Sequence, residues 1–414
     1  MINLDSVLSE FSPSPSQSRT FYAAIDWWIH GHYGIFEISG PPGAGKSLLI
    51  NMIVKAFGIP MERVACMAYT GSAAINMRLK GMQNARTIFS WLYDFKEVPI
   101  LDQYGKPLLD PVFHTPRYKM EFVPKGSLPG IELLIIDEGG MVPENMLPVL
   151  LHLGIPIIVA GDLDQLPPVA GKPAFLTNPD TVHKLTEIMR QEENNTIIQF
   201  SQMLLHGIPI PYGKHGNVLV MYDDEVTDDI ISKSDILICG KNATRDALNN
   251  HVRHDMFGFK SKTPNLGERI VCRKNNWNIE AGGINLTNGL LGSCVSIPDP
   301  SSFNIDDRTF KIWFKPDSIP EIFQDVDVDY DYITCTDKKR RDELLSNFHK
   351  KGNKFEFGYA ITTHMSQGSE YSKGIYFEEY MNADINRNLH YVGITRFRDR
   401  CIYVKHRPKN YYYK

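Results

Sequence analysis

The sequence has 414 residues, 43% of them hydrophobic and 22% charged, and a formal net charge of -4. This balance is typical of a folded chain of about two to four domains and excludes the disordered and collagen-like classes. Because the net charge is slightly negative, it gives no general argument for a polyanionic partner, so nucleic-acid binding must be argued from particular residues.

The cysteines and the first residues restrict the cellular compartment. Six cysteines are scattered along the chain without a CxxC pair, which predicts reduced, buried thiols and neither zinc nor disulfides. The opening MINLDSVLSEF lacks the basic and apolar regions of a secretion signal, and no apolar run of about 18 residues predicts a membrane span. We therefore expect a cytoplasmic protein without membrane contact.

In chain order, a helical pattern comes first and is followed by a strand, a loop and a second helix. Residues 19–31 carry apolar side chains at helical spacing. YGIFEIS (33–39) is typical of a short buried strand, and residues 47–58 of an amphipathic helix. The intervening GPPGAGK (40–46) is then the loop of a strand-loop-helix unit.

Two further apolar runs predict parallel strands of the same sheet. ELLIID (132–137) and IPIIVAGD (155–162) both end in carboxylates, as expected where parallel strands deliver side chains to the carboxyl edge of an open sheet. After a polar stretch, a second set of apolar runs predicts another α/β domain, with strands at 235–239, 374–380 and 400–406.

Two insertions interrupt this plan. Residues 96–124 contain DQYG (102–105) between VPIL and KPLL, which predicts a β-hairpin that leaves the first domain. Residues 262–352 carry short β-like runs separated by Pro, Asp and Gly, which predicts a small β-rich module. Within it, the acidic 325–331 and the basic 338–341 are interpreted as solvated loops rather than binding sites.

The segment GPPGAGKS matches the phosphate-binding pattern G-x-x-x-x-G-K-[ST]. Its glycines Gly40, Gly43 and Gly45 let backbone amides surround phosphates, Lys46 reaches the β and γ groups, and Ser47 can ligate Mg²⁺. A chance glycine-rich turn is the alternative, but the predicted strand and helix on either side favour a nucleotide site.

Two later strand ends complete a predicted hydrolytic site. Asp137 can hold Mg²⁺ through water, while the adjacent Glu138 can orient or deprotonate the attacking water. Gln165 follows the third strand, where its amide can contact both the γ-phosphate and the water. Without the P-loop, the same residues would be an ordinary strand end and a proline-rich turn.

Two arginines are candidates for neutralising the charge of the transition state. LTEIMRQ carries Arg190 beyond the last motif of the first domain, and HYVGITRFR carries Arg396 in the second. An arginine in this role contributes about 10³ to 10⁵ in rate. Each could instead belong to a surface ion pair, but the surrounding motifs favour the catalytic interpretation and a cleft that closes on ATP.

These motifs run in order from Gln17 to Arg396 and resemble those of the superfamily 1 helicases of the 5′-to-3′ branch, the Dda-like and RecD-like group, at a phage-type size. The resemblance implies an α/β fold of two RecA-like P-loop domains with ATP and Mg²⁺ between them. It also implies that Gln17 reads adenine and that Gly368 and Glu370 lie near the sugar and phosphates. The P-loop residues implied to bind the nucleotide are Gly40, Pro41, Pro42, Gly43, Ala44, Gly45, Lys46 and Ser47.

The resemblance further implies a track for single-stranded DNA. The residues implied to contact its backbone are Thr70, Thr87, Thr362 and His364. Phe89 and Trp91 lie in the ARTIFSW segment and could stack on bases, although packing in the core explains these two aromatic residues equally well.

The resemblance also gives the two insertions roles, as a pin that separates strands and as an SH3-like module. The predicted limits are 1–190 for the first RecA-like domain with the pin at 96–124, 191–261 and 353–414 for the second, and 262–352 for the module. The implied function is an ATP-dependent helicase or translocase that moves 5′-to-3′ on single-stranded DNA. We expect a monomer that acts on forked or duplex DNA, with a single-strand-binding or replication protein as a candidate partner, in the host cytoplasm if a phage encodes it.

Three positions depart from the family pattern. Gly140 stands where a serine hydroxyl usually links the ATP and DNA sites, Met365 where a lysine often follows the histidine, and Tyr69 where a proline is usual. We therefore expect altered coupling and a weaker charged contact to DNA. Three alternatives stay open, namely a translocase that displaces proteins with little unwinding, a P-loop kinase or switch that binds no nucleic acid, and a structural clamp with a vestigial site.

Overall fold

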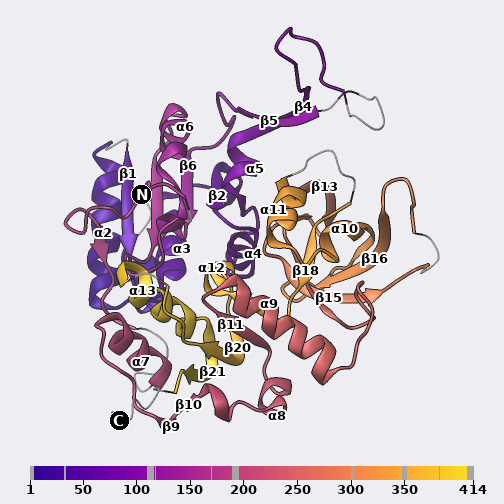
Figure 1. The fold of residues 1–414 in the computed structure, drawn as a ribbon. Helices are drawn as coiled ribbons and strands as arrows, with labels where there is room; N and C mark the ends of the chain where they lie inside the picture. The colour runs from indigo at the N-terminus through magenta and orange to yellow at the C-terminus, as the bar shows by residue number, and fades with distance from the viewer. Residues whose placement is uncertain are drawn as a thin grey trace.

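The computed structural model describes residues 4–31, 34–109, 116, 118–168, 170–188, 195–299, 303–346, 352–381 and 383–407. Helices and strands in these ranges form two parallel α/β sheets and a smaller antiparallel one (Figure 1). The predicted α/β fold is confirmed. Arg190 lies outside the described residues.

The first sheet has six parallel strands in the order β3-β2-β6-β7-β1-β8. They are β1 (Ile35–Ser39), β2 (Val64–Ala68), β3 (Arg86–Thr87), β6 (Leu133–Asp137), β7 (Ile157–Gly161) and β8 (His183–Lys184). The central strands are buried on both faces, which is why their sequences are almost continuously apolar. Around them lie α1 (Leu4–Phe11), α2 (Pro15–Ile29), α3 (Lys46–Phe57), α4 (Gly71–Leu79), α5 (Ile88–Leu92) and α6 (Leu147–His152).

The order of this sheet positions the site. Strands β6, β7 and β1 are neighbours, and Ser39 at the end of β1 pairs with Gly161 at the end of β7. The loops that follow these three strands therefore leave the same edge side by side, although they are far apart in the sequence. This edge is where an open α/β sheet binds its ligand.

The second sheet has the order β19-β11-β20-β21-β10-β9, parallel except for β9. Its strands are β9 (Gly213–His215), β10 (Val218–Tyr222), β11 (Ile236–Cys239), β19 (Ala360–Thr362), β20 (Tyr371–Phe377) and β21 (Phe397–Lys405). Its helices are α7 (Thr196–Leu205), α8 (Asp228–Ser232), α9 (Asn242–Asn250), α12 (Thr363–Ser366) and α13 (Ala383–Thr395). A short π-helix, His251–Met256, continues α9.

A five-stranded antiparallel sheet, with the order β17-β16-β15-β12-β18, is inserted between β11 and β19. It consists of β12 (Arg269–Cys272), β15 (Leu291–Ser296), β16 (Thr309–Pro316), β17 (Phe323–Asp329) and β18 (Phe355–Phe357), accompanied by α10 (Tyr330–Ile333) and α11 (Lys338–Ser346). A separate hairpin, β13 (Asn276–Ala281) with β14 (Ile284–Leu286), extends from it. We call this sheet, its helices and the hairpin the module, whose last strand ends at Phe357, beyond the predicted limit of 352. Figure 1 shows it in orange beside α4 and α9.

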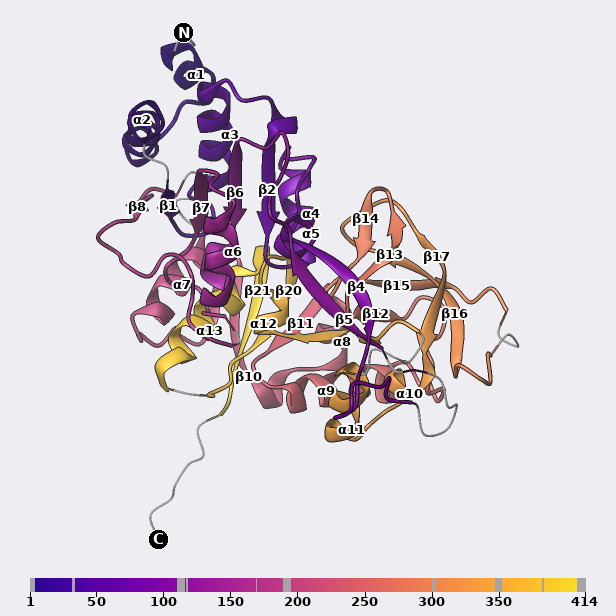
Figure 2. The same cartoon turned by 90° about the horizontal axis from the view of Figure 1, so that it is seen from above.

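The second insertion is a two-stranded ribbon made of β4 (Tyr93–Pro99) and β5 (Tyr118–Pro124). Around DQYG the chain forms a small hairpin, in which Leu101 bridges Pro107, the Asp102 N–H donates to the Lys106 carbonyl at 2.7 Å and the Leu108 N–H donates to the Ile100 carbonyl at 2.6 Å. The long ladder of the ribbon lies farther from this turn, between residues 93–99 and 118–124. The ribbon projects from the first domain on the side that holds the module (Figure 2).

All six cysteines are free thiols, five of them buried and Cys335 half-buried. Burial raises the pKa of Cys66 to about 12 and that of Cys294 to about 11, so these thiols stay protonated and unreactive.

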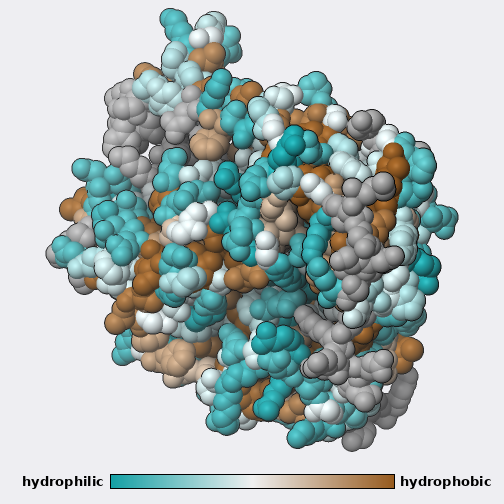
Figure 3. Space-filling view, turned by 180° about the vertical axis from the view of Figure 1, so that it is seen from behind, coloured by the Kyte–Doolittle hydropathy of each residue, from teal (hydrophilic) through white to brown (hydrophobic). Residues whose placement is uncertain are grey.

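On the face shown in Figure 3, hydrophilic and hydrophobic residues are interspersed. Among the helices of the described ranges, none is both long and apolar enough to cross a membrane.

Candidate nucleotide site and nucleic-acid track

The P-loop connects β1 to α3 through two glycines in the left-handed region. Gly43 has φ 86° and Gly45 has φ 76°, conformations that glycine adopts without strain. Lys46 is the first residue of α3, and its Nζ donates hydrogen bonds to the carbonyl oxygens of Gly40 at 2.6 Å and Pro41 at 3.1 Å. The ammonium group thus sits against the loop that is predicted to surround the phosphates.

A cavity of 330 Å³ opens above this loop, between the two parallel sheets. It brings together most of the predicted nucleotide-site residues from both halves of the chain. Those from the first half are Pro42, Gly43, Gly45, Lys46, Ser47, Asp137, Glu138 and Gln165, and those from the second half are Gly368, Glu370 and Arg396.

Glu138 lies at the base of the cavity with a strained backbone. Its φ of 55° is in the left-handed region, which a non-glycine residue adopts at a cost and which is common at functional sites. Burial raises the pKa of Glu138, and the neighbouring Asp137 raises it further, while Arg396 and Lys46 act in the opposite direction. The carboxylate therefore depends on two cations to stay ionised, which suits a proton acceptor.

Gln165 lies in a loop that contacts the part of the cavity formed by the second half of the chain. In that loop, Asp162 accepts a hydrogen bond from Tyr391 Oη at 2.6 Å, and the carbonyl of Asp164 accepts one from Asn388 Nδ2 at 2.8 Å. Tyr391 and Asn388 both lie on α13, whose last residues border the cavity. The loop and α13 thus hold the two sides of the site together.

Arg396 directly follows α13 and is only 4% exposed. Its guanidinium donates to three neutral oxygens, the carbonyls of Val392 at 3.0 Å and Ser369 at 3.3 Å and the hydroxyl of Thr395 at 3.3 Å. In the described part of the chain, no carboxylate lies within ion-pair distance of it. A buried cation without a direct ion pair is costly, and although Arg396 acts on Glu138 through space, its position favours a further anion in the cavity.

Gln17 does not line the cavity in this structure. It is fully buried behind the P-loop, where Nε2 donates to the carbonyl of Ala44 at 2.9 Å and Oε1 accepts from the backbone N–H of Ser14 at 2.9 Å. Its amide therefore braces the loop and caps α2. Whether it also reads adenine stays a prediction.

The sequence interpretation missed several residues of the site. Asn76 and Lys80 line the cavity from α4 and its C-terminal cap, and Asn76 donates from Nδ2 to the carbonyl of Gly368. Glu187 accepts hydrogen bonds from the hydroxyl groups of Ser16 and Ser14 at the start of α2, and these bonds lower the pKa of Glu187 to about 2. The helical spacing after AYTGSAA could have indicated Asn76, but the contact of Glu187 spans about 170 residues and has no local signal.

The three threonines predicted to meet the DNA backbone share one structural feature. Thr70, Thr87 and Thr362 are the N-caps of α4, α5 and α12, and each hydroxyl oxygen accepts a backbone N–H at 3.2 to 3.4 Å. A capping hydroxyl keeps its own proton as a donor, so it can still contact a phosphate. His364 lies beside Thr362, and burial lowers its pKa, which favours the neutral imidazole.

The two candidate stacking residues differ in environment. Trp91 donates its indole N–H to the carbonyl of Cys66 at 2.9 Å, which ties it to the core of the first sheet. Phe89 instead packs with Tyr93 and Phe122 at the base of the ribbon and borders a cavity of 220 Å³ together with Trp277 of the module. Of the two, Phe89 is the better placed for a base.

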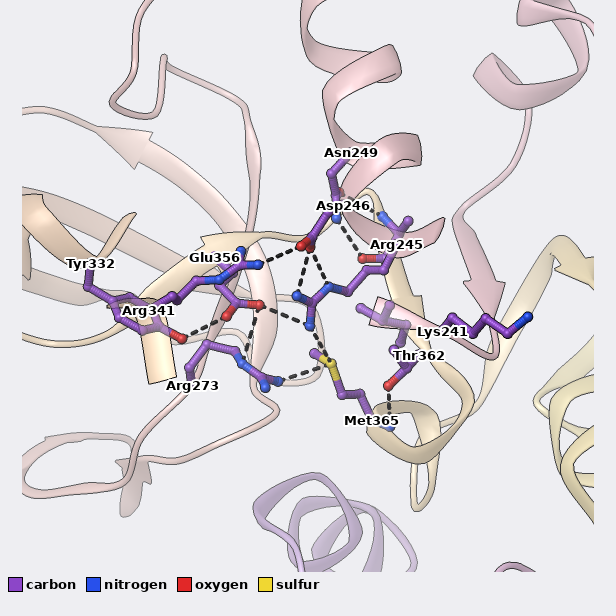
Figure 4. Close-up of polar contacts among 12 residues, drawn as sticks. Lys241, Arg245, Asp246, Asn249, Arg273, Tyr332, Arg341, Glu356, Thr362 and Met365 are labelled. Carbon is purple, nitrogen blue, oxygen red and sulfur yellow. Dashed lines mark hydrogen bonds and ion pairs between the residues drawn. The ribbon is translucent and has the colours of Figure 1, made fainter. Parts of the chain in front are cut away.

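A lysine at position 365 would be expected to face open solvent, but the side chain of Met365 does not. Its Sδ lies 3.0 Å from Nη1 of Arg273 and 3.7 Å from Nη1 of Arg245 (Figure 4). The positive charge absent from position 365 is therefore present next to it in space, supplied by α9 and by the module.

Comparisons with known proteins agree with this architecture. Residues 21–222 match the protein family described as AAA domain. A sequence relative, the ATP-dependent RecD2 DNA helicase of Deinococcus radiodurans, is 27% identical over 295 residues. That match covers 65% of this chain and 36% of the relative, so the chain spans only about a third of the relative's length.

The fold is shared with solved Pif1 structures. The Candida albicans Pif1 helicase is 16% identical with a TM-score of 0.51, and the match covers 94% of each chain. The Bacteroides Pif1 helicase, solved with ADP-AlF3 and ssDNA, is 19% identical with a TM-score of 0.53, covering 94% of this chain and 92% of that one. This shared fold and the match of residues 21–222 to the AAA domain family agree with the resemblance of the motifs to superfamily 1 helicases of the 5′-to-3′ branch.

Proposed function

We propose that this protein hydrolyses ATP to move 5′-to-3′ along single-stranded DNA and to separate duplex strands at a fork. The observation that carries the proposal is the cavity in which Lys46, Glu138 and Gln165 meet Arg396 from the second half of the chain, whose guanidinium makes no direct ion pair within the described residues. A nucleotide bound there would touch both halves, so its hydrolysis would change how they hold each other.

The chemistry assigned to the chain's own residues follows from their positions. Lys46 exchanges the carbonyls of Gly40 and Pro41 for phosphate oxygens, and Arg396 neutralises charge on the transferring group. Glu138 takes the proton of the attacking water, which Gln165 orients. Catalysis of this kind consists mainly of positioning and charge stabilisation.

Ser47 and Asp137 fit a magnesium ion that accompanies the nucleotide. Both line the cavity and offer hard oxygen donors, the kind that Mg²⁺ prefers. Across the described ranges, no group of three or more His, Cys, Asp or Glu residues could hold a metal ion by itself. With Ser47 and Asp137 as its protein ligands, such an ion would take further oxygens from the nucleotide and from water, and it would supply charge neutralisation at the phosphates.

Movement along DNA is proposed to follow from alternating grip. The capping threonines of α4 and α5 belong to the first half and that of α12 to the second, so closure of the cavity shortens the distance between two holds on one strand. Hydroxyl and backbone contacts of this kind do not depend on sequence. The ribbon of β4 and β5, at the edge of the first half, is the proposed pin. Action as a monomer and a partner protein at the fork remain part of this proposal.

The test is steady-state ATP hydrolysis with and without an unstructured single-stranded oligodeoxynucleotide, with Lys46→Ala as the blank. We expect strong stimulation by the oligonucleotide in the wild type and no turnover in the variant. Forks with a single 5′ or 3′ tail then test polarity, and only the 5′-tailed fork should be unwound. Equal hydrolysis with and without DNA would contradict the proposal and favour a nucleotide switch.

A further inference from the structure

Five charged side chains form one largely buried cluster beside Met365, where the module meets the second sheet (Figure 4). They come from α9, from the residue after β12, from α11 and from β18. The members are Arg245, Asp246, Arg273, Arg341 and Glu356. Three guanidinium groups face two carboxylates, so the cluster carries one excess positive charge.

The pairing within this cluster is uneven. Arg245 lies 2.7 Å from Asp246 Oδ1 and 3.1 Å from Glu356 Oε2, and Arg341 lies 2.5 Å from Asp246 Oδ2. The other oxygen of Glu356 accepts a hydrogen bond from the buried Tyr332 hydroxyl at 2.6 Å. Asp246 is thus engaged by the other two arginines, while Glu356 Oε2, which makes no hydrogen bond within the described residues, is shared between Arg245 and Arg273.

Arg273 has the weakest partners of the three arginines. Its Nε lies 3.4 Å from Glu356 Oε2 but, within the described residues, makes no hydrogen bond. Its Nη1 donates to the sulfur of Met365 at 3.0 Å, and a thioether is a weak acceptor. A guanidinium prefers the paired oxygens of a carboxylate or a phosphate, so Arg273 is the group in the cluster with most to gain from an added anion.

Position and access decide which anion can reach it. Met365 lies on α12, whose N-cap is Thr362, and the exposed Lys241 precedes α9 next to it (Figure 4). The Arg273 side chain is 18% exposed, against 5% for Arg245, so it remains accessible from this edge. An extended polyanion held by Thr362 would pass these side chains.

We propose that Arg273 of the module binds a phosphate of the nucleic-acid strand, exchanging the Met365 sulfur for a phosphate oxygen. This inference rests on the proposed function and adds a contact from the module to it. It also explains the neutral residue at 365, since a lysine there would face two guanidinium groups within 4 Å. The module then contributes directly to the grip of the second half.

The test is the salt dependence of binding to a fluorescent, unstructured oligodeoxynucleotide, measured without nucleotide. Each phosphate contact on a single strand contributes about 0.7 to the slope of log K against log salt concentration. Arg273→Gln should weaken binding and reduce this slope by about 0.7. Arg340→Gln is the matched control, because Arg340 is exposed on the same module and, among the described residues, forms an ion pair with Glu343 alone. It should leave the slope unchanged.

A charge relocation separates this role from a folding defect. Met365→Lys alone adds a cation to the cluster and should lower the thermal midpoint, whereas Met365→Lys combined with Arg273→Met should restore both the midpoint and the wild-type slope. A wild-type slope in Arg273→Gln, or a double variant that folds but keeps the reduced slope, would overturn the inference and leave the proposed function intact. A wild-type protein that binds no oligonucleotide would overturn both.

Discussion

Replacement of Arg396 by Gln should remove turnover while preserving the fold. Arg396 is 4% exposed, and the hydrogen-bond acceptors of its guanidinium are three neutral oxygens, so its loss breaks no direct ion pair within the described residues. Loss of an arginine that neutralises transition-state charge costs about 10³ to 10⁵ in rate, or about 4 to 7 kcal/mol of barrier. Stability should change much less, because removal of the buried charge also removes its desolvation cost and this offsets the loss of its attraction to Glu138.

The assay is DNA-stimulated ATP hydrolysis at saturating ATP, combined with thermal unfolding and ADP binding. Arg398→Gln is the matched control, since Arg398 is two residues away, 58% exposed and paired with Asp399. The control should keep wild-type turnover. If Arg396→Gln retained more than about a tenth of the wild-type rate, the assignment of Arg396 to the transition state would be wrong.

The pH dependence gives a second and independent readout of the same variant. Arg396 is one of two cations that lower the pKa of Glu138 against the effects of burial and Asp137. Glu138 must be ionised to accept a proton, so turnover falls as the pH drops through its pKa. Without Arg396 that pKa rises, and the acidic limb of the residual activity should move to higher pH. An unmoved limb would refute this electrostatic link.

Three further changes test the nucleotide site and the ribbon. Glu138→Gln should abolish turnover but raise the thermal midpoint at neutral pH, because burial raises the folded-state pKa of Glu138 above its unfolded value of about 4.3. This gain in the thermal midpoint should shrink as the pH falls toward that value, and a gain that does not change with pH would contradict the prediction. Gly139→Ala should destabilise the folded protein by about 1 to 3 kcal/mol, because the added Cβ would lie 2.2 Å from Val159 Cγ1. At the neighbouring position there is room for a side chain, so Gly140→Ser should leave the thermal midpoint unchanged and increase the stimulation of ATP hydrolysis by DNA. Replacement of residues 100–116 by a short turn should abolish strand separation on a fork but spare DNA-stimulated hydrolysis, which gel-based unwinding and ATPase assays would check.

The structure brings the predicted nucleotide residues together where they follow strands that are adjacent in one sheet. The P-loop, Asp137 and Glu138 follow apolar runs whose strands are adjacent in the sheet, so strand order alone brings them together. Arg396 was assigned from its motif, and the cavity places it opposite them. Local pattern and parallel topology are sufficient for this part of the fold.

Prediction was poorer where an outcome depends on distant contacts. Trp91 has the sequence surroundings of a stacking residue, but its indole N–H binds a strand carbonyl of the first sheet. The sequence around DQYG indicated the small hairpin at the turn, but the long ladder pairs 93–99 with 118–124, which are about 20 to 30 residues apart. The partners of Met365 come from residues about 90 and 120 positions away in the chain. No periodicity in the sequence encodes such pairs.

Helix α4 offers a route for coupling that does not need a hydroxyl at position 140. One of its faces lines the nucleotide cavity with Ala73 and Asn76, and Asn76 also holds the carbonyl of Gly368 from the second half. The opposite face meets the module, where Arg78 Nη1 donates to the carbonyl of Gly283 at 2.8 Å. There Gly71 packs so closely against the module that a Cβ would lie 2.0 Å from Thr287 Oγ1. Because one short helix makes all of these contacts, a shift of Gly368 that keeps its hydrogen bond to Asn76 would either move the module with it or break the hydrogen bond from Arg78 to Gly283.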